Sequence, residues 1–433
     1  LLGISDKVKS STMMFHQKGI AASIVNKQKM KAVYAAKAAA NPNNGYQPKE
    51  PLTMKNVFVL KTSDEQENIL QLIQQIKENP NVEYAEPNYI YGIDNFEVGE
   101  MITAEQAAKL SSTGNLNPLT PNDPLYSSQT NITSTNIDDV WGDHTTGDGS
   151  QVIAILDTGV DYTHPDLEAN IWINEAELNG VEGYDDDDNG YIDDIRGWDF
   201  INSDNAPLDD NMHGTHVAGI AGAVGNNGIG IAGAAWNVKL MPIKVFQSSG
   251  QGNLVTIADG VEYAYMNGAT IINMSFGGYS ESYTFKLALE NAYSTTSLVG
   301  ASGNNGLGIG PDCLGCKPFY PAAYSYIIAT MDYSGYSNYD QDGVRRTMYQ
   351  NLLNYEIHSP GTNIISTIPN GGYASLTGTS MGAPLLSGAI ALYKEVLPEN
   401  SNELMMGSLI HTAPNWFDIH SAINTIPTPE LDI

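Results

Sequence analysis

The sequence predicts an α/β fold: a mostly parallel central sheet flanked by helices, preceded by a small α+β domain. Four short apolar runs in the second part of the chain have the continuity expected of strands buried on both faces, as in a parallel sheet. Segments with helical spacing of apolar residues separate these runs, and that alternation indicates helices packed on the sheet. The runs are residues 152–156, 238–243, 270–274 and 297–300, and the helical segments are residues 213–223, 255–266 and 284–292.

The first part of the chain has a shorter strand–helix–strand pattern. Residues 57–60 predict a strand, and residues 65–78 predict a helix because their apolar side chains recur at helical spacing. Asn79 precedes Pro80, which disfavours further helix, and residues 82–85 predict a second strand. We interpret residues 57–92 as a small domain, residues 1–56 as a leader or linker, and residues 93–120 as an exposed polar connector.

Charge divides the chain near residue 120. Residues 1–120 hold 12 basic and 12 acidic side chains, whereas residues 121–433 hold 8 basic and 37 acidic ones and carry the whole net charge of −29. The shift supports a main domain over residues 121–425 with a short tail at 426–433. An acidic surface argues against nucleic acid or anionic membranes as partners. The absence of any run of eighteen apolar residues argues against a membrane-spanning helix, so we expect a soluble, secreted monomer.

Three segments carry the residue types of nucleophilic catalysis. Asp157 ends the apolar run of residues 152–156, His213 opens a helical segment, and Ser380 lies in the segment Gly-Thr-Ser-Met-Gly-Ala-Pro. A serine hydroxyl needs an adjacent base to act as a nucleophile, and a carboxylate can hold that base in the required tautomer. Each residue alone could be an ordinary strand end or helix cap, so the prediction depends on all three together.

In the order Asp, His, Ser, these segments resemble the subtilase family of serine proteases, over about residues 57–92 and 121–412. The resemblance implies an endopeptidase whose triad is Asp157, His213 and Ser380. It also implies that the Asn304 side chain and the Ser380 N–H stabilise the oxyanion. Further residues are implied to bind an extended peptide by strand addition, with Leu254 in an apolar S4 subsite. They are Ser275, Phe276 and Gly277 along the S1 pocket, and Gly252 and Leu254 along the opposite edge.

The small N-terminal domain resembles the inhibitory propeptide of this family, most clearly in the segment Asn-Pro-Asn-Val-Glu-Tyr-Ala-Glu-Pro-Asn-Tyr-Ile-Tyr-Gly. A tethered domain has a high effective concentration, so it blocks the cleft until the chain is cut. The resemblance therefore implies a zymogen that processes itself, with the maturation cut in the connector of residues 93–120.

Two loops are candidate Ca²⁺ sites because they offer oxygen ligands, as a hard cation requires. In the acidic loop, the side chains at positions one, three, five and nine of a calcium loop are Asp185, Asp187, Asn189 and Asp193. Position twelve, where such a loop usually has a glutamate, is Arg196. A solvated acidic loop is the alternative. The second loop resembles the high-affinity calcium loop of the family, and a metal-free glycine-rich turn is its alternative. The implied ligands are the Asn227 side chain, the carbonyls of Gly225, Ile229 and Ile231, and the carboxylates of Asp123 and Asp166.

Two other functions remain as alternatives. Gly382 replaces the alanine usual in the family and creates a Gly-x-Ser-x-Gly pattern, which is typical of α/β-hydrolase esterases. That interpretation requires an acid and a base after Ser380, from Asp418 or Asp432 and either His411 or His420. The other alternative is an inactive, calcium-stabilised binding module on the same fold. For Cys313 and Cys316, a small loop disulfide and free thiols are both considered, the disulfide first.

Overall fold

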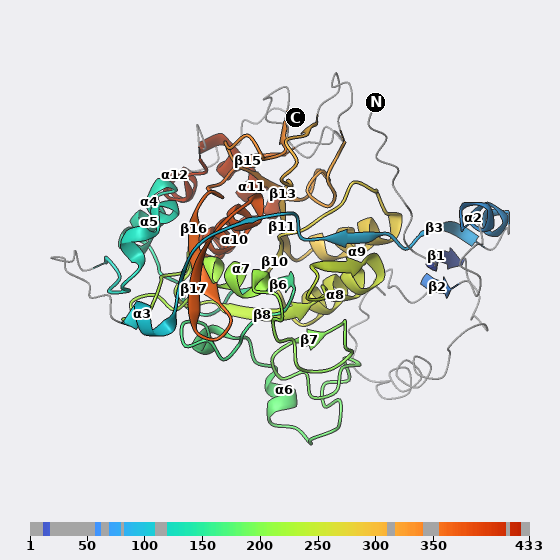
Figure 1. Ribbon diagram of the computed structural model, residues 1–433, viewed down its shortest axis with the longest axis horizontal. Helices are drawn as coiled ribbons and strands as arrows, with labels where there is room; N and C mark the ends of the chain where they lie inside the picture. The colour runs from blue at the N-terminus through green and yellow to red at the C-terminus, as the bar shows by residue number, and fades with distance from the viewer. Residues whose placement is uncertain are drawn as a thin grey trace.

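A seven-stranded parallel sheet forms the centre of the chain's computed structural model (Figure 1). The structure describes residues 12–17, 57–61, 69–78, 82–108, 119–309, 317–340, 355–412 and 416–425. The strand order is β15-β13-β11-β10-β6-β8-β7, and each neighbouring pair is parallel. The strands are β6 (Val152–Asp157), β7 (Trp198–Asp199), β8 (Lys239–Lys244), β10 (Ile271–Met274), β11 (Ser297–Ala301), β13 (Ile328–Met331) and β15 (Ile357–His358).

The sheet is buried on both faces, and β6 shows how the sequence achieves this. Ile153 and Ile155 belong to one apolar cluster, whereas Ala154 and Leu156 belong to another. Because successive side chains of a strand point to opposite faces, the two clusters are the cores on the two sides of the sheet. This arrangement confirms the predicted α/β fold, and the four apolar runs correspond to β6, β8, β10 and β11.

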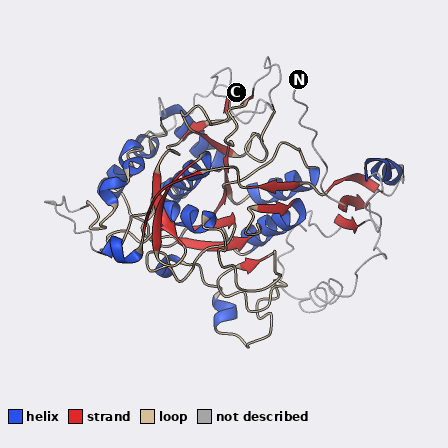
Figure 2. Cartoon of the chain, viewed as in Figure 1, coloured by secondary structure: helices blue, strands red, loops and turns tan. Residues whose placement is uncertain are grey.

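Helices cover both faces of this sheet (Figure 2). The first cluster takes apolar side chains from α7 (His213–Gly222) and α10 (Thr379–Val396), and the second from α8 (Leu254–Met266) and α9 (Tyr283–Tyr293). Further helices surround this body. They are α4 (Thr130–Ser134), α5 (Ile137–Asp143), α6 (Glu175–Leu178), α11 (Asn402–Thr412), α12 (Ile419–Asn424), and the 3₁₀ helices η2 (Tyr126–Ser128) and η3 (Glu168–Asn170).

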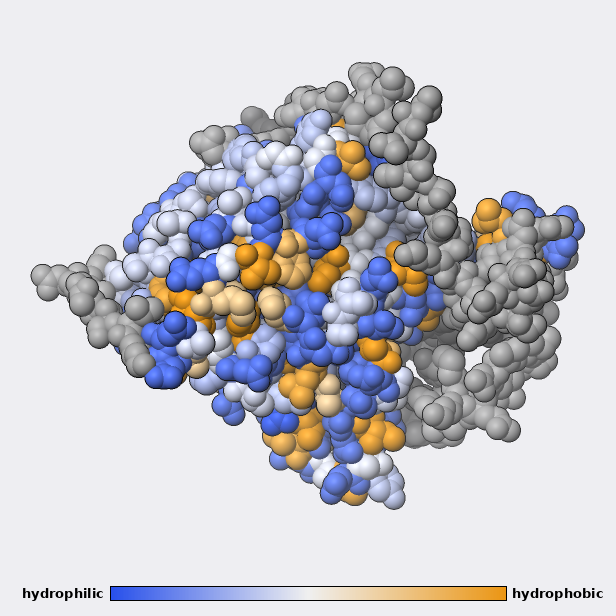
Figure 3. Space-filling model, viewed as in Figure 1, coloured by the Kyte–Doolittle hydropathy of each residue, from blue (hydrophilic) through white to orange (hydrophobic). Residues whose placement is uncertain are grey.

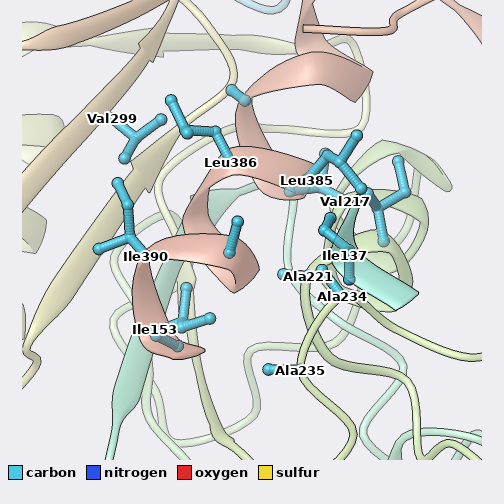
Figure 4. Close-up of a cluster of buried hydrophobic side chains, with 14 of the residues drawn as sticks. Ile137, Ile153, Val217, Ala221, Ala234, Ala235, Val299, Leu385, Leu386 and Ile390 are labelled. Carbon is cyan, nitrogen blue, oxygen red and sulfur yellow. The ribbon is translucent and has the colours of Figure 1, made fainter. Parts of the chain in front are cut away.

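The helix α10 runs through the interior beside the strands. Its residues from Thr379 to Tyr393 are all buried, and Leu386 and Ile390 lie beside Val299 of β11 and Ile153 of β6 (Figure 4). A helix that is apolar nearly all round is stable only inside a core. The burial of α10 therefore fixes the position of its first residues near the carboxyl end of the central strand β10.

The small N-terminal domain is an antiparallel sheet of order β2-β1-β3 with one helix, α2, packed on it. Its elements are β1 (Thr12–Gln17), β2 (Val57–Lys61), α2 (Ile69–Lys77) and β3 (Val82–Pro87). The strand–helix–strand prediction is thus matched by β2, α2 and β3. However, β1 comes from residues that the sequence analysis assigned to a leader, so this sheet extends beyond residues 57–92.

The connector predicted over residues 93–120 is not a simple exposed linker. Part of it forms β5 (Glu97–Ile102), which pairs with β17, and α3 (Ala104–Ala108) follows. In Figure 1 this blue segment runs from the small domain across the main body to α3. The remaining strands are β4 (Ile90–Gly92), β9 (Gln251–Asn253), β12 (Gly308–Ile309), β14 (Tyr339–Asp340), β16 (Ile364–Ile368) and β17 (Gly372–Thr377).

The visible surface is mainly hydrophilic, with small apolar areas between the polar side chains (Figure 3). The described residues contain no helix that is long and apolar enough to cross a membrane. Cys313, Cys316 and the tail of residues 426–433 lie outside the described residues.

Truncating the buried helix tests this packing. Leu386→Ala removes a side chain with no exposed surface, so we expect the free energy of unfolding to fall by about 2–5 kcal/mol. Leu404→Ala is the matched control, because Leu404 of α11 is 46% exposed and its loss should change stability little. Denaturant unfolding measures both variants, and equal losses would contradict the assigned burial of α10.

Candidate active site

Asp157 and His213 form a buried pair at the carboxyl end of β6. Asp157 is the last residue of that strand and His213 is the first of α7. The imidazole Nδ1 lies 2.8 Å from one carboxylate oxygen of Asp157 and 3.0 Å from the other, and both residues are fully buried. The Thr158 N–H also donates to the carboxylate, at 2.7 Å. Because Nδ1 faces the acid, the other ring nitrogen, Nε2, is the one that remains to accept a proton.

Asp209 holds the start of α7 in place. Its carboxylate accepts hydrogen bonds from the N–H groups of Met212 and Thr215 and from the hydroxyl groups of Thr215 and Thr158. The same Thr158 hydroxyl accepts the N–H of Gly214 at 3.0 Å. One carboxylate therefore ties the end of β6 to the first turn of the helix that carries His213. The sequence analysis missed Asp209, although its place four residues before His213 was visible.

Gly214 is required for this close approach. A Cβ atom at residue 214 would lie 2.0 Å from the Gly159 carbonyl oxygen and 3.1 Å from the Asp157 Cβ. Real Cβ atoms do not approach a backbone oxygen so closely. A glycine therefore lets α7 pack directly against the strand end, which brings the imidazole of His213 to the carboxylate.

Ser380 lies in the first turn of α10 and is tied to Ser275, which follows β10. The Ser380 hydroxyl donates to the Ser275 carbonyl at 3.0 Å, and the Ser275 hydroxyl donates to the Ser380 carbonyl at 2.9 Å. In a regular helix the Ser380 carbonyl would accept the N–H of residue 384, but that residue is Pro384, which has none. The Ser275 hydroxyl thus satisfies a buried carbonyl that the proline leaves free.

The His213 Nε2 atom is buried and has no hydrogen-bond partner among the described residues. The predicted bond between this nitrogen and Ser380 is therefore not formed in this structure. Ser380 uses its hydroxyl on the Ser275 carbonyl instead. Rotation about the Ser380 side chain would be needed to direct that hydroxyl toward His213.

Asn304 is oriented by its neighbour in space, Thr379. The Asn304 side-chain oxygen accepts both the N–H and the hydroxyl of Thr379, each at 2.9 Å. This fixes which way the amide points, and its Nδ2 donates to the carbonyl of Asn95 at 2.9 Å. The residue predicted to cradle an oxyanion is therefore a fixed donor beside Ser380, and in this structure it binds a carbonyl of the chain itself.

Residues 90–93 occupy the predicted peptide-binding edges. The strand β4 pairs with β9 in antiparallel fashion, with Tyr91 opposite Gly252. On its other side, Gly92 exchanges two backbone hydrogen bonds with Gly277, of 3.2 and 3.1 Å, and the Ile93 N–H donates to the Gly250 carbonyl. The segment is thus held as the middle strand between two edges, which is how a sheet edge binds an extended peptide.

Tyr91 fills an apolar pocket in this cleft. It is 2% exposed, belongs to the same cluster as Leu254, and contacts the ring of Phe285 edge-on with ring centres 5.8 Å apart. A Cβ atom at Gly278 would lie 2.5 Å from the Tyr91 ring. Leu254 is fully buried, and its role in an apolar S4 subsite stays a prediction. The Phe276 side chain is also buried and packs against the Phe246 ring, with ring centres 4.8 Å apart.

The next residues of the segment pass over the pair formed by Asp157 and His213. One carboxylate oxygen of Asp94 accepts the N–H of Asn304 at 2.7 Å and the side-chain amide of Asn305 at 3.2 Å. Burial raises the pKa of Asp94, and these two hydrogen bonds oppose that rise. The Phe96 ring lies 5.2 Å from the His213 ring, centre to centre. Sequence reasoning had placed these residues in an exposed connector.

The structure brings the carboxylates of Asp123 and Asp166 to the glycine-rich loop that follows α7. Asp123 accepts the N–H groups of Asn226 and Asn227, and Asp166 accepts the Asn227 side-chain amide and the Ile231 N–H. Burial raises the pKa of Asp123 to about 6 and that of Asp166 to about 7. Because these hydrogen bonds come from neutral donors, two buried carboxylates are left without charge compensation from them. A cation would supply it.

The acidic loop gathers a different set of residues from the one predicted. Glu177, Asp185 and Asp187 bring carboxylate oxygens within 4.8 Å of one another and could hold a metal ion. Asp193, which was predicted as a ligand, is not in this group, and its carboxylate accepts the N–H of Gly183 instead. The Asn189 amide nitrogen donates to Asp187 at 3.0 Å. Glu177 was missed because it lies eight residues before Asp185 along the chain.

The esterase alternative finds no support in the surroundings of Ser380. The strand before it, β17, belongs to an antiparallel sheet with β16 and β5 rather than to the central parallel sheet. His420 contacts Asp143 at 3.0 Å, and Asp418 caps the start of α12. Asp418 and His420 therefore serve other contacts, and Asp432 lies outside the described residues.

A buried carboxylate–imidazole pair is one part of the catalytic arrangement of serine hydrolases, and a reactive serine is the other. The family profile described as Subtilase family matches residues 148–425. The chain therefore belongs to the subtilase family and is a serine-type endopeptidase.

Individual relatives agree with this assignment. The chain is 34% identical to the thermophilic serine proteinase of Bacillus sp. (strain AK1) over 84% of this chain and 74% of that protein. It is 35% identical to thermitase of Thermoactinomyces vulgaris over 63% of this chain and 85% of that protein. Among solved structures, fervidolysin from Fervidobacterium pennivorans has a similar fold, with a TM-score of 0.67 and 21% identity. That match covers 97% of this chain and 61% of the fervidolysin chain.

Asp209 provides a test of how the site is positioned. In Asp209→Ala, the Thr158 and Thr215 hydroxyls and three N–H groups lose their acceptor, so we expect a stability loss of about 2 kcal/mol or more and a lower kcat with a smaller change in KM. The matched control is Asp204→Ala, which removes an exposed carboxylate from the same region. Denaturant unfolding and peptide hydrolysis measure the two effects, and an unchanged kcat for Asp209→Ala would contradict the positioning role.

Proposed function

We propose that the chain hydrolyses peptide bonds through Asp157, His213 and Ser380, by way of an acyl-enzyme. The observation that carries this proposal is the orientation of His213. Both oxygens of Asp157 lie within 3.0 Å of Nδ1, while the buried Nε2 is left without a partner in the described residues. An imidazole held in this way can accept a proton at Nε2 and is stabilised as an imidazolium by the adjacent carboxylate.

The proposed reaction begins when the Ser380 hydroxyl turns from the Ser275 carbonyl to His213. His213 takes the hydroxyl proton as the Ser380 oxygen bonds to the substrate carbonyl carbon. The carbonyl oxygen becomes an oxyanion, which the Asn304 amide and the Ser380 N–H stabilise. His213 then gives its proton to the leaving amine as the peptide bond breaks. Water repeats the sequence on the acyl-enzyme and regenerates Ser380.

Substitutions of the proposed catalytic residues should lower kcat by different factors. Asp157→Asn should keep the fold but lower kcat by about 10⁴-fold, because the amide favours the wrong imidazole tautomer. Asn304→Ala should lower kcat by about 10²–10³-fold through loss of one oxyanion donor. Single-turnover hydrolysis of a chromogenic peptide measures both. Wild-type rates for Asp157→Asn in a correctly folded sample would remove the triad proposal.

We also propose that the chain is a zymogen whose N-terminal domain inhibits it. The segment of residues 90–96 fills the cleft, and two side chains join the small domain to helix starts of the main body. Glu86 accepts the N–H groups of Tyr283 and Thr284 at the start of α9. Asn88 contacts Asn253, which caps the start of α8. A carboxylate at a helix N-terminus is favourable because it meets free N–H groups and the positive end of the dipole.

The proposed maturation cut lies at one of the two peptide bonds of Asn95. The Asn304 amide contacts the Asn95 carbonyl, and Asp94 is held on the other side of the same asparagine. Self-processing should therefore produce a new N-terminus at Asn95 or Phe96. Such a cut frees the segment that now lies over the catalytic group.

Processing tests the zymogen proposal. Expressed in a protease-free host, the wild-type chain should yield a fragment that begins at Asn95 or Phe96, whereas Ser380→Ala should stay full length. Glu86→Ala should speed the appearance of activity, since the N–H groups of Tyr283 and Thr284 lose their acceptor. Glu78→Ala, which removes an exposed carboxylate from the same small domain, should not. Equal processing of the wild type and Ser380→Ala would argue against self-maturation.

We further propose that Ca²⁺ binds at the loop near Asp123 and Asp166, and at the group formed by Glu177, Asp185 and Asp187. Bound cations would compensate carboxylates that otherwise repel one another or lie buried. In the Ser380→Ala background, which prevents self-digestion, chelator should lower Tm by about 5 °C or more. Asp166→Asn should reduce this response, and Glu168→Gln, at an exposed position, should not. An unchanged Tm in excess chelator would contradict both sites.

Secretion and a monomeric state remain predictions from composition. The alternative of an inactive binding module would require that His213 and Ser380 never meet in solution.

A further inference from the structure

The peptide-binding cleft contains a polar pocket next to the catalytic group, and the chain's own Asp94 occupies it. One Asp94 oxygen accepts two hydrogen bonds, from the Asn304 backbone and from the Asn305 side chain. The same Asn304 presents its side-chain amide to the Asn95 carbonyl. The pocket therefore lies beside the atom that the oxyanion donor binds, where a side chain affects catalysis directly.

The donors of this pocket are held by a network of hydrogen bonds. The Gly303 N–H donates to the Thr379 hydroxyl at 3.1 Å, and the Asn338 side chain accepts the Asn305 N–H at 3.3 Å. Asn338 in turn donates to the Ser302 carbonyl at 2.8 Å. Because the backbone of residues 302–305 is fixed on both sides, the Asn304 N–H cannot easily turn away from an unsuitable side chain.

Gly303 also shapes the pocket. Its φ of +97° is in the region that favours glycine, and a Cβ atom there would lie 3.1 Å from the Asp94 oxygen and 2.6 Å from the Asn338 amide nitrogen. The space between the backbone of residue 94 and the turn at Gly303 is therefore short. It fits a side chain as long as that of aspartate, whose oxygens lie two bonds beyond Cβ. A longer chain would have to displace the turn.

We propose that this pocket selects substrates that carry a short, oxygen-bearing side chain, aspartate or asparagine, at the position of Asp94. Two N–H donors converge on one oxygen. An apolar side chain would leave the half-buried Asn304 N–H without this acceptor, whereas the exposed Asn305 amide would donate to water instead. Sites built to hydrogen-bond a substrate group reject analogues that lack it much more strongly than apolar pockets reject a change of size. A lysine ammonium is itself only a donor, so it could not accept a hydrogen bond from the N–H groups of Asn304 and Asn305. The proposal rests on the peptidase function proposed above and narrows its substrates.

Peptides that copy the chain's own segment test this selection. Wild-type full chain, allowed to mature, is given internally quenched peptides of residues 88–99, with Asp94 kept or replaced by asparagine, leucine or lysine. The aspartate and asparagine peptides should have kcat/KM about tenfold or more above the leucine and lysine peptides. A peptide with Glu97→Gln, which removes the nearby acid outside the pocket, is the matched control and should stay within about twofold.

A variant of the enzyme provides the reciprocal test. Asn305→Asp replaces a donor by a carboxylate, so cleavage of the aspartate peptide should fall by about tenfold while the lysine peptide gains relative to it. Leucine or lysine peptides that are cut within about threefold of the aspartate peptide by the wild type would overturn the selection and leave the peptidase function intact. If no peptide is cut faster by the wild type than by Ser380→Ala, the proposed function itself fails.

Discussion

The contact between the Asp157 carboxylate and the His213 imidazole is the constraint on which the site depends. Both groups are fully buried, and a buried polar pair is tolerated only when its geometry is well satisfied. The chain meets this demand with Gly214, which lets α7 approach the strand end, and with Asp209, which fixes the first turn of that helix. Ser380 is held by a comparable contact, because the Ser275 hydroxyl donates to the Ser380 carbonyl that Pro384 leaves without a helical partner.

Backbone hydrogen bonds hold the chain's own residues 90–93 between two strand edges. Gly252 and Gly277 offer strand edges that any extended segment can join, and the segment of residues 90–96 does so while remaining tethered. Side-chain pockets then distinguish segments: an apolar one holds Tyr91, and a polar one holds Asp94. In this account, inhibition before maturation and selection of substrates afterwards depend on the same contacts.

The sequence predicted the elements whose signals are local. Buried strands such as β6 are continuous apolar runs, and Asp157 follows such a run, so both were accessible. The strands β7, β13 and β15 were not predicted. Two residues, as in β7 and β15, carry no recognisable pattern, and β13 is only four residues long. The path of residues 94–96 through the cleft and the approach of Glu177 to Asp185 were missed for another reason. They are tertiary contacts between polar residues, and no spacing along the chain encodes them.

The most direct measurement is covalent labelling of the matured chain with a serine-directed phosphonylating reagent, followed by mass spectrometry. A working group of three residues makes one serine far more nucleophilic than the others. The account predicts one adduct per molecule, on Ser380, and its loss in the folded His213→Ala variant. Absence of an adduct from the folded wild type, or labelling that does not depend on His213, would contradict the account.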